Sequence, residues 1–204
     1  EKAKLKVKEK FEKINKEKAI VYNTIQLYRW DRLQFLKDSY LKGESSGYKV
    51  GVKLVRGAYM EKERKRAETK GYKSPIQIDK PATDKDYDLA VEYCVENKIA
   101  VCVGTHNEQS SMLMVNLLAE KQLDKSDSAY YFAQLLGMSD HISFNLSSQG
   151  FNVAKYVPYG PVKEVIPYLI RRAEENTSVA GQTSRELSLI SSEIKRRKLL
   201  STSR

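Results

Sequence analysis

The chain has 204 residues, of which 41% are hydrophobic and 30% are charged, and its formal net charge is +10. This length suits one domain or most of a larger one, and the composition argues against intrinsic disorder. We expect no targeting segment and no membrane-spanning helix, and the two cysteines, Cys94 and Cys102, match neither a zinc motif nor a disulfide framework.

Short apolar runs rich in β-branched residues alternate with longer charged segments, and glycine or proline lies at many boundaries. The apolar runs predict buried strands, and the charged segments predict helices. In chain order, the first part is expected to form a strand at residues 19–27, a helix at 29–42, a turn at 43–47, a strand at 48–59, a charged helix at 60–71 and a loop at 74–82.

Candidate N-caps help to place the later helices. Thr83, with Asp86 in the first turn, is expected to cap one helix, and Asn107 the next. Pro167 is expected to kink a late helix or to mark its start. The second part is expected to form a helix at residues 84–98, a strand at 99–104, a helix at 107–121, a strand at 129–136, an irregular segment at 141–150, a strand at 153–157, a helix from 161 to about 175 and an amphipathic helix at 184–200.

Buried strands separated by helices indicate an α/β fold with a parallel sheet and helical crossovers. We count about five strand–helix units in the sequence. The chain contains neither a GxGxxG motif nor a P-loop motif, so neither a Rossmann dinucleotide site nor a nucleotide-hydrolase site is supported.

Polar residues follow the apolar runs at their carboxyl ends. Because parallel strands all point the same way, these residues are expected to share one rim, which is where barrel enzymes carry their chemistry. Lys53 and Val55 share one face of their strand, and a lysine there is costly unless it is paired or faces a ligand. The rim residues are Gln26, Lys53, Arg56, Thr105, His106, Gln134 and Tyr156.

Two adjacent arginines, Arg171 and Arg172, lie on a partly apolar helix near the end of the chain. Glu175 is close enough along the helix to bridge either guanidinium. Such a pair suits a carboxylate ligand, because each guanidinium can donate two parallel hydrogen bonds. A surface helix with intrahelical ion pairs is the alternative interpretation.

Five segments stand out in chain order: KLVRGAY (53–59), THN (105–107), YFAQLLGM (131–138), KYVPYGP (155–161) and YLIRRAEENTS (168–178). Together they resemble the proline dehydrogenase family, in the family's order and with compatible spacing. The resemblance covers most of residues 19–178 and is greatest to the branch that includes the mitochondrial enzymes. It implies a partial (β/α)8 TIM-like barrel, beginning just before the fourth strand, with the last helix over the carboxyl-terminal mouth. Residues 1–204 would be the C-terminal portion of one domain, with 19–178 as its core.

The resemblance also implies roles for individual residues. Arg171 and Arg172 would hold the proline carboxylate, and Glu175 would anchor that pair. Tyr156 would pack against the proline ring, and Tyr59 near the flavin edge. Lys53 completes the predicted catalytic group. The residues expected to bind FAD are Gln26, Val55, Arg56, Gly57, Ala58, Thr105, His106 and Gln134.

The chain departs from the family pattern at several positions. Lys53 stands where many members carry an arginine, which keeps the charge but loses the bidentate geometry. Met60 stands where some members carry an aromatic residue. The family's lysine and aspartate from the early strands lie outside this chain.

The implied reaction is hydride transfer from proline C5 to FAD, giving Δ1-pyrroline-5-carboxylate, with electrons passed to a quinone. Oxidation of hydroxyproline or another cyclic amine on the same fold remains an alternative. So does a non-catalytic chain whose basic ends bind nucleic acid, although no specific nucleic acid is expected. Peripheral membrane contact and self-association stay open. The expected location is the cytoplasm, peripheral to the inner membrane, for a bacterial source and the mitochondrion for a eukaryotic one.

Overall fold

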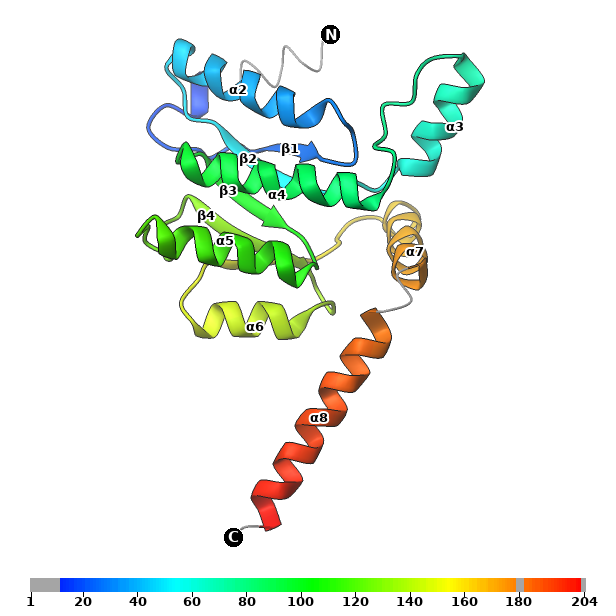
Figure 1. Ribbon diagram of the computed structural model, residues 1–204. Coiled ribbons are helices and arrows are strands. Elements are labelled where there is room, and N and C mark those ends of the chain that lie inside the picture. Colours follow the sequence, from blue (N-terminus) through cyan, green and yellow to red (C-terminus); the bar gives the residue numbers. More distant parts are fainter. Residues whose placement is uncertain (1–11, 179–181, 203–204) are drawn as a thin grey trace. The chain divides into compact units, whose positions relative to one another are not determined.

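The computed structural model describes residues 12–178 and 182–202 (Figure 1). The chain divides into two compact units, Glu1–Val157 and Pro158–Arg204. Each unit is described by itself below.

The first unit is built on a five-stranded parallel sheet whose strands follow one another in chain order. This order requires a crossover between each pair of neighbours, and helices supply the crossovers. The arrangement confirms the predicted α/β fold, a partial (β/α)8 barrel of five strands. The strands are β1 (Asn23–Gln26), β2 (Gly51–Val55), β3 (Ala100–Gly104), β4 (Tyr130–Leu135) and β5 (Val153–Tyr156).

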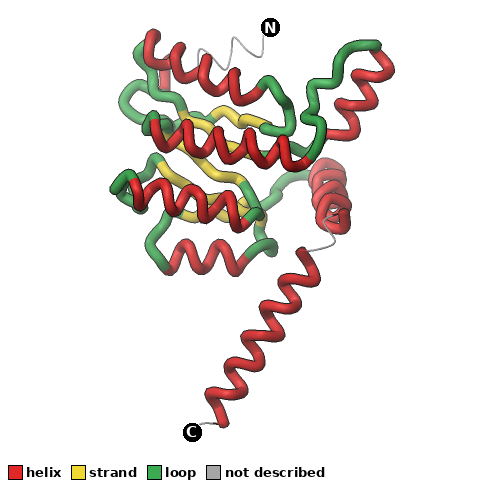
Figure 2. The backbone as a smooth tube through the Cα atoms, in the orientation of Figure 1, coloured by secondary structure: helices red, strands yellow, loops and turns green. Residues whose placement is uncertain are grey.

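One face of the sheet is covered by a row of helices (Figures 1 and 2). Alternate strand residues such as Val52, Leu54 and Val103 point into this layer and are completely buried. Each such side chain contributes about 1.5–3 kcal/mol of apolar transfer free energy. The covering helices are α2 (Arg32–Ser46), α4 (Lys80–Glu96), α5 (Glu108–Glu120) and α6 (Asp140–Ser148).

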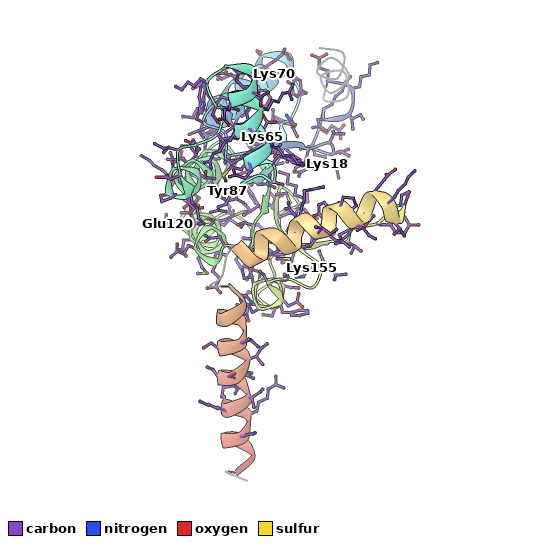
Figure 3. All side chains as sticks on the ribbon, turned by 90° about the vertical axis from the view of Figure 1, so that its right-hand side faces the viewer. Lys18, Lys65, Lys70, Tyr87, Glu120 and Lys155 are labelled. Atoms are coloured by element: carbon purple, nitrogen blue, oxygen red, sulfur yellow. The ribbon has the colours of Figure 1, made fainter. Side chains whose placement is uncertain are left out.

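Helix α3 (Met60–Lys70) follows β2 and stands apart from this row in Figure 1. Lys65 and Lys70, labelled in Figure 3, are exposed on it. It ends at Gly71, which has a φ of 66°. The positive φ suits glycine and matches the predicted end of this helix.

Two predicted boundaries near the first helices were wrong. The turn at residues 43–47 is mostly helix, because α2 continues to Ser46 and ends at Gly47. Gly43 lies buried inside α2, where an added Cβ would come within 2.5 Å of Val50. Helix α4 begins before Thr83: Asp79 is the N-cap and accepts a hydrogen bond from the Ala82 amide.

The segment at residues 141–150, predicted to be irregular, is largely helix α6. Three serines and one asparagine lie in α6, and these residue types have low helix propensity. Ile142 and Leu146, one helical turn apart, are both buried in the core beneath α6. Packing of this apolar stripe therefore outweighs the unfavourable propensity.

The second unit contains α7 (Val162–Ser178) and α8 (Gln182–Thr202). Pro167 lies inside α7, and so it does not mark the start of that helix. The predicted amphipathic helix is present as α8, where Leu187, Ile190 and Ile194 are exposed. Among the described residues, no helix is long and apolar enough to cross a membrane.

Candidate active site

The carboxyl ends of the first strands form one edge of the sheet. Gln26 is paired with Val55 across β1 and β2, and the chain beyond Gln26 continues alongside β2. The Leu27 and Tyr28 amides donate to the carbonyl oxygens of Val55 and Arg56 at 2.9 and 2.8 Å. These predicted cofactor-binding residues are therefore neighbours, as the parallel topology requires.

Lys53 and Tyr156 meet on the face of the sheet opposite the helix layer. The Lys53 Nζ atom lies 5.4 Å from the centroid of the Tyr156 ring. Their strands, β2 and β5, are three strand spacings apart, which is roughly 14 Å in a flat sheet. The contact therefore requires a curved sheet with this face concave, as in a barrel. Two of the three predicted catalytic residues lie together on this face.

Cys102 is the register partner of Lys53 on β3 and lies on the same face. Burial raises the pKa of the Cys102 thiol, and the nearby Lys53 charge lowers it in part. Gly104, further along β3, faces Lys53 and Val55, and an added Cβ would lie 3.1 Å from atoms of both side chains. The concave face thus combines one cation with small and apolar neighbours.

Gly57 has a φ of 123° and packs against the ring of Tyr28. An added Cβ would lie 2.0 Å from the nearest ring carbon, so only glycine fits at this position. Ala58 follows, and Tyr59, the third predicted catalytic residue, is 41% exposed at the start of α3. The Lys62 Nζ atom lies 5.8 Å from the Tyr59 ring centroid.

Arg56 is held by side chains from three elements. Its guanidinium donates to Asp84 on α4, to Thr105 after β3 and to Ser110 on α5. It also stacks on the completely buried ring of Tyr87, which is labelled in Figure 3. The predicted residues Arg56 and Thr105 are therefore in direct contact.

Gln134 is buried on the helix-covered side of β4. Its amide nitrogen donates to the Thr105 carbonyl oxygen at 3.2 Å, and its amide oxygen accepts from Ser143 on α6 at 2.9 Å. The His106 Nδ1 atom lies 2.9 Å from the Ser139 hydroxyl, which precedes α6. Gln134 is thus linked to the predicted cofactor-binding residues by its hydrogen bond to Thr105. Ser139 is linked to them by its hydrogen bond with His106.

The predicted carboxylate-binding arginines lie on α7 in the second unit. The Arg172 guanidinium carbon lies 5.4 Å from the Tyr168 ring centroid. The side chain of Glu175 lies outside the described part of the chain. That Arg171 and Arg172 face the concave side of the sheet stays a prediction.

Sequence reasoning missed the residues that surround the predicted ones. Asp84, Asp88 and Ser110 support Arg56, and Ser139 and Ser143 support His106 and Gln134. Asp84 and Asp88 lie one helical turn apart beside buried Tyr87, which is the one local signal available. Among the described residues, no group of three or more acidic, histidine or cysteine side chains could hold a metal ion.

Comparison with known proteins agrees with this geometry. The family model described as proline dehydrogenase matches residues 2–185. Proline dehydrogenase 1, mitochondrial, of Caenorhabditis elegans is 41% identical over 196 residues, which is 93% of this chain and 32% of the relative. The human protein of the same name is 42% identical over 190 residues, covering 91% of this chain and 32% of the relative. A hydroxyproline dehydrogenase of Xenopus laevis is 41% identical over 189 residues, which is 90% of this chain and 41% of the relative.

Solved structures give the same result. Proline utilization A from Bdellovibrio bacteriovorus superposes with a TM-score of 0.78 at 26% identity, covering 86% of this chain and 18% of that one. The chain spans between about a third and two fifths of the length of the curated relatives named above. The family model covers most of the chain, and the chain therefore belongs to the proline dehydrogenase family.

Proposed function

We propose that the protein catalyses the FAD-dependent oxidation of L-proline to Δ1-pyrroline-5-carboxylate, with a quinone as the final electron acceptor. The observation that carries this proposal is the contact of Lys53 with Tyr156 on the concave face, beside the polar strand ends. FAD, when bound, supplies the acceptor for the hydride that leaves proline C5. The names of the relatives support L-proline as the substrate.

The residues present fit a flavin nucleotide. Gly57 and Gly104 allow close packing at the strand ends: Gly57 lies against the Tyr28 ring, and Gly104 lies against Lys53 and Val55. A flat ring would bind on the concave face beside these residues. The Arg56 guanidinium is held by Asp84, Thr105 and Ser110, so Arg56 would support a bound cofactor by ordering the strand ends. Gln26, Ala58, Thr105 and His106 would supply further contacts, with Gln134 acting from behind through Thr105.

The substrate would be held by its carboxylate and its ring. We assign the carboxylate to Arg171 and Arg172, because two adjacent forks can fix its orientation. The proline ring would pack on Tyr156, whose own position is fixed in part by Lys53. Such fixation aims C5 at the acceptor, which is catalysis by proximity. The proline nitrogen must be neutral when the hydride leaves, so activity should rise at mildly alkaline pH.

A second candidate is oxidation of hydroxyproline, because a hydroxyproline dehydrogenase is among the similar proteins. We assign the preference for proline to Tyr156, because a large ring against the substrate would leave less room for an added hydroxyl. Rates with L-proline and hydroxyproline, measured on the same preparation, separate the two. A higher kcat/KM for hydroxyproline would replace our assignment.

A third candidate is a protein without catalytic function whose basic ends bind nucleic acid. An intact mass and a visible absorption spectrum test it together. Flavin absorbance in the purified protein supports the enzyme. Nucleic-acid binding that weakens with salt, in a protein that takes up no flavin, would support the alternative.

The cellular setting is also a proposal. Several relatives are named mitochondrial, which supports a mitochondrial location if the source is eukaryotic. For a bacterial source we propose the cytoplasmic side of the inner membrane. The excess of positive charge would favour an anionic membrane surface there. Sedimentation with anionic vesicles, compared with neutral ones, tests that contact.

A further inference from the structure

The guanidinium of Arg56 uses all three of its nitrogens to bind protein. The Nε atom donates to Asp84 Oδ1 at 2.5 Å, Nη1 to Thr105 Oγ1 at 2.9 Å and Nη2 to Ser110 Oγ at 3.0 Å. The guanidinium carbon lies 4.2 Å from the centroid of the Tyr87 ring. The Arg56 side chain therefore has one defined position.

The partners of Arg56 are themselves fixed by other groups. The Ser110 hydroxyl donates to Asp88 Oδ1 at 2.7 Å, and the Tyr87 hydroxyl donates to the Leu54 carbonyl oxygen at 3.3 Å. Tyr87 is 0% exposed and Ser110 is 1% exposed. Because these partners come from α4 and α5, Arg56 cannot shift without disturbing both helices.

Arg56 in turn holds the backbone where the candidate cofactor site begins. Its carbonyl oxygen accepts from the Tyr28 amide at 2.8 Å, and the next residue is Gly57, packed on the Tyr28 ring. In the segment that follows β2, the side chain of Arg56 fixes Arg56 itself, and the Tyr28 ring fixes Gly57. The Arg56 guanidinium also donates a hydrogen bond to Thr105, which precedes His106. One guanidinium thus links two strand ends.

Asp84 supplies the negative charge that this half-buried cation needs. A guanidinium stays protonated and charged, so burying the group away from water is costly unless a carboxylate balances its charge. Burial raises the pKa of Asp84, but hydrogen bonds from Lys80 and Arg56 outweigh this effect and leave the pKa below its usual value. The carboxyl group is therefore ionised at neutral pH.

We propose that Asp84 is a positioning residue that acts through Arg56, holding the backbone of residues 56–58 and Thr105 in the arrangement that binds FAD. This inference rests on the proposed function, because it takes FAD as the ligand of these strand ends. The physical gain is preorganisation: a site that is already ordered loses less conformational entropy on binding.

The other ion pair of Asp84 has a different character. Lys80 reaches Asp84 Oδ2 from one turn earlier on α4, and its side chain is 65% exposed. Exposed pairs of this spacing contribute little, because water and salt screen them. Lys80→Ala is therefore a matched control, because this substitution removes a partner of Asp84 and leaves the contact of Asp84 with Arg56 in place.

The test is a double-mutant cycle on the natural protein, read by FAD affinity. Asp84→Asn keeps the shape of the side chain and should weaken FAD binding about tenfold or more, the effect of losing one charge-assisted partner. In an Arg56→Gln background, Asp84→Asn should cause no further loss, because Asp84 acts through Arg56. Lys80→Ala, on the same helix, should bind FAD as the parent does.

Hydrogen exchange in the cofactor-free protein provides a readout that needs no FAD. Amides of residues 57–59 should exchange faster in Asp84→Asn than in the parent, whereas Lys80→Ala should leave them unchanged. Unchanged FAD affinity and exchange in Asp84→Asn would overturn the inference, as would equal losses for Asp84→Asn in both backgrounds. Faster exchange in a protein whose parent binds no FAD would support the link from Asp84 to Arg56 and refute the proposed function.

Discussion

The hydroxyl of Ser139 lies 2.9 Å from His106 Nδ1 and does not cap the helix that Ser139 precedes. Serine at an N-cap normally accepts a hydrogen bond from an amide of the first helical turn. Ser139 instead has a φ of 52° and is 3% exposed. Its left-handed backbone and its hydrogen bond to His106 are both unusual for a residue that begins a helix.

Ser139→Gly should weaken FAD binding while leaving the fold intact. Glycine relieves a left-handed strain of about 1 kcal/mol, which offsets a lost hydrogen bond of about the same size. The free energy of unfolding should therefore change by less than about 1 kcal/mol. Denaturant unfolding and FAD titration measure the two effects separately.

Gln122→Gly is the matched control for this backbone effect. Gln122 has the same φ of 52°, is exposed and lies outside the candidate site. This variant should gain a little stability and bind FAD normally. If Ser139→Gly also bound FAD normally, the hydrogen bond to His106 would have no part in the site.

Gly57→Ala should destabilise the protein by about 2 kcal/mol or more, because the backbone conformation suits only glycine. An added Cβ would also lie 2.0 Å from a ring carbon of Tyr28. Gly71→Ala is the control, since Gly71 has a φ of 66° but nothing within 4 Å of an added Cβ. Thermal unfolding of both variants should show a clearly larger loss for Gly57→Ala. Equal losses would mean that the contact with Tyr28 has no energetic weight.

Arg171→Ala and Arg172→Ala should each raise the KM for proline. Loss of one charge-assisted pair costs about 1.5–3 kcal/mol, which corresponds to roughly ten- to a hundredfold in KM. Arg196→Ala, which removes an exposed arginine paired with Glu193 on α8, should leave KM unchanged. Unchanged KM in both α7 variants would remove the carboxylate assignment.

Tyr156→Ser should reduce the preference for proline over hydroxyproline. The substitution removes the ring that lies beside Lys53 and opens space on the concave face. Tyr159→Ser is the control, because Tyr159 is 98% exposed. The ratio of kcat/KM values for the two substrates is the measurement. A ratio that changes equally in both variants would indicate a general effect on the fold.

The strands could be predicted because each is a short apolar run flanked by charged helices. The parallel order then followed from the helical crossovers, and it placed Gln26 and Arg56 together correctly. Helix α6 was missed because several of its residues are poor helix formers, and the packing of Ile142 and Leu146 in the core helps to stabilise it. The i, i+4 spacing of Ile142 and Leu146 is the local sign of this helix, and one such pair among polar residues does not establish a helix.

The supporting residues of the site could not be predicted for a similar reason. Asp84 and Ser110 lie 28 and 54 residues from Arg56 in sequence, and their pairing depends on how α4 and α5 pack. Strand alternation alone predicted the face of β2 on which Lys53 lies, because Val52 and Leu54 on either side of it are buried on the opposite face. The position of Arg171 and Arg172 relative to the strand ends stays a prediction from the family resemblance.

The most direct test is to add L-proline to the natural protein without oxygen and to follow its visible absorption. The account predicts a bound flavin whose oxidised absorbance is lost on adding proline. The double variant with both Arg171→Ala and Arg172→Ala should need far more proline for the same loss of absorbance. Flavin absorbance that proline leaves unchanged, or a purified protein that takes up no flavin, would contradict it.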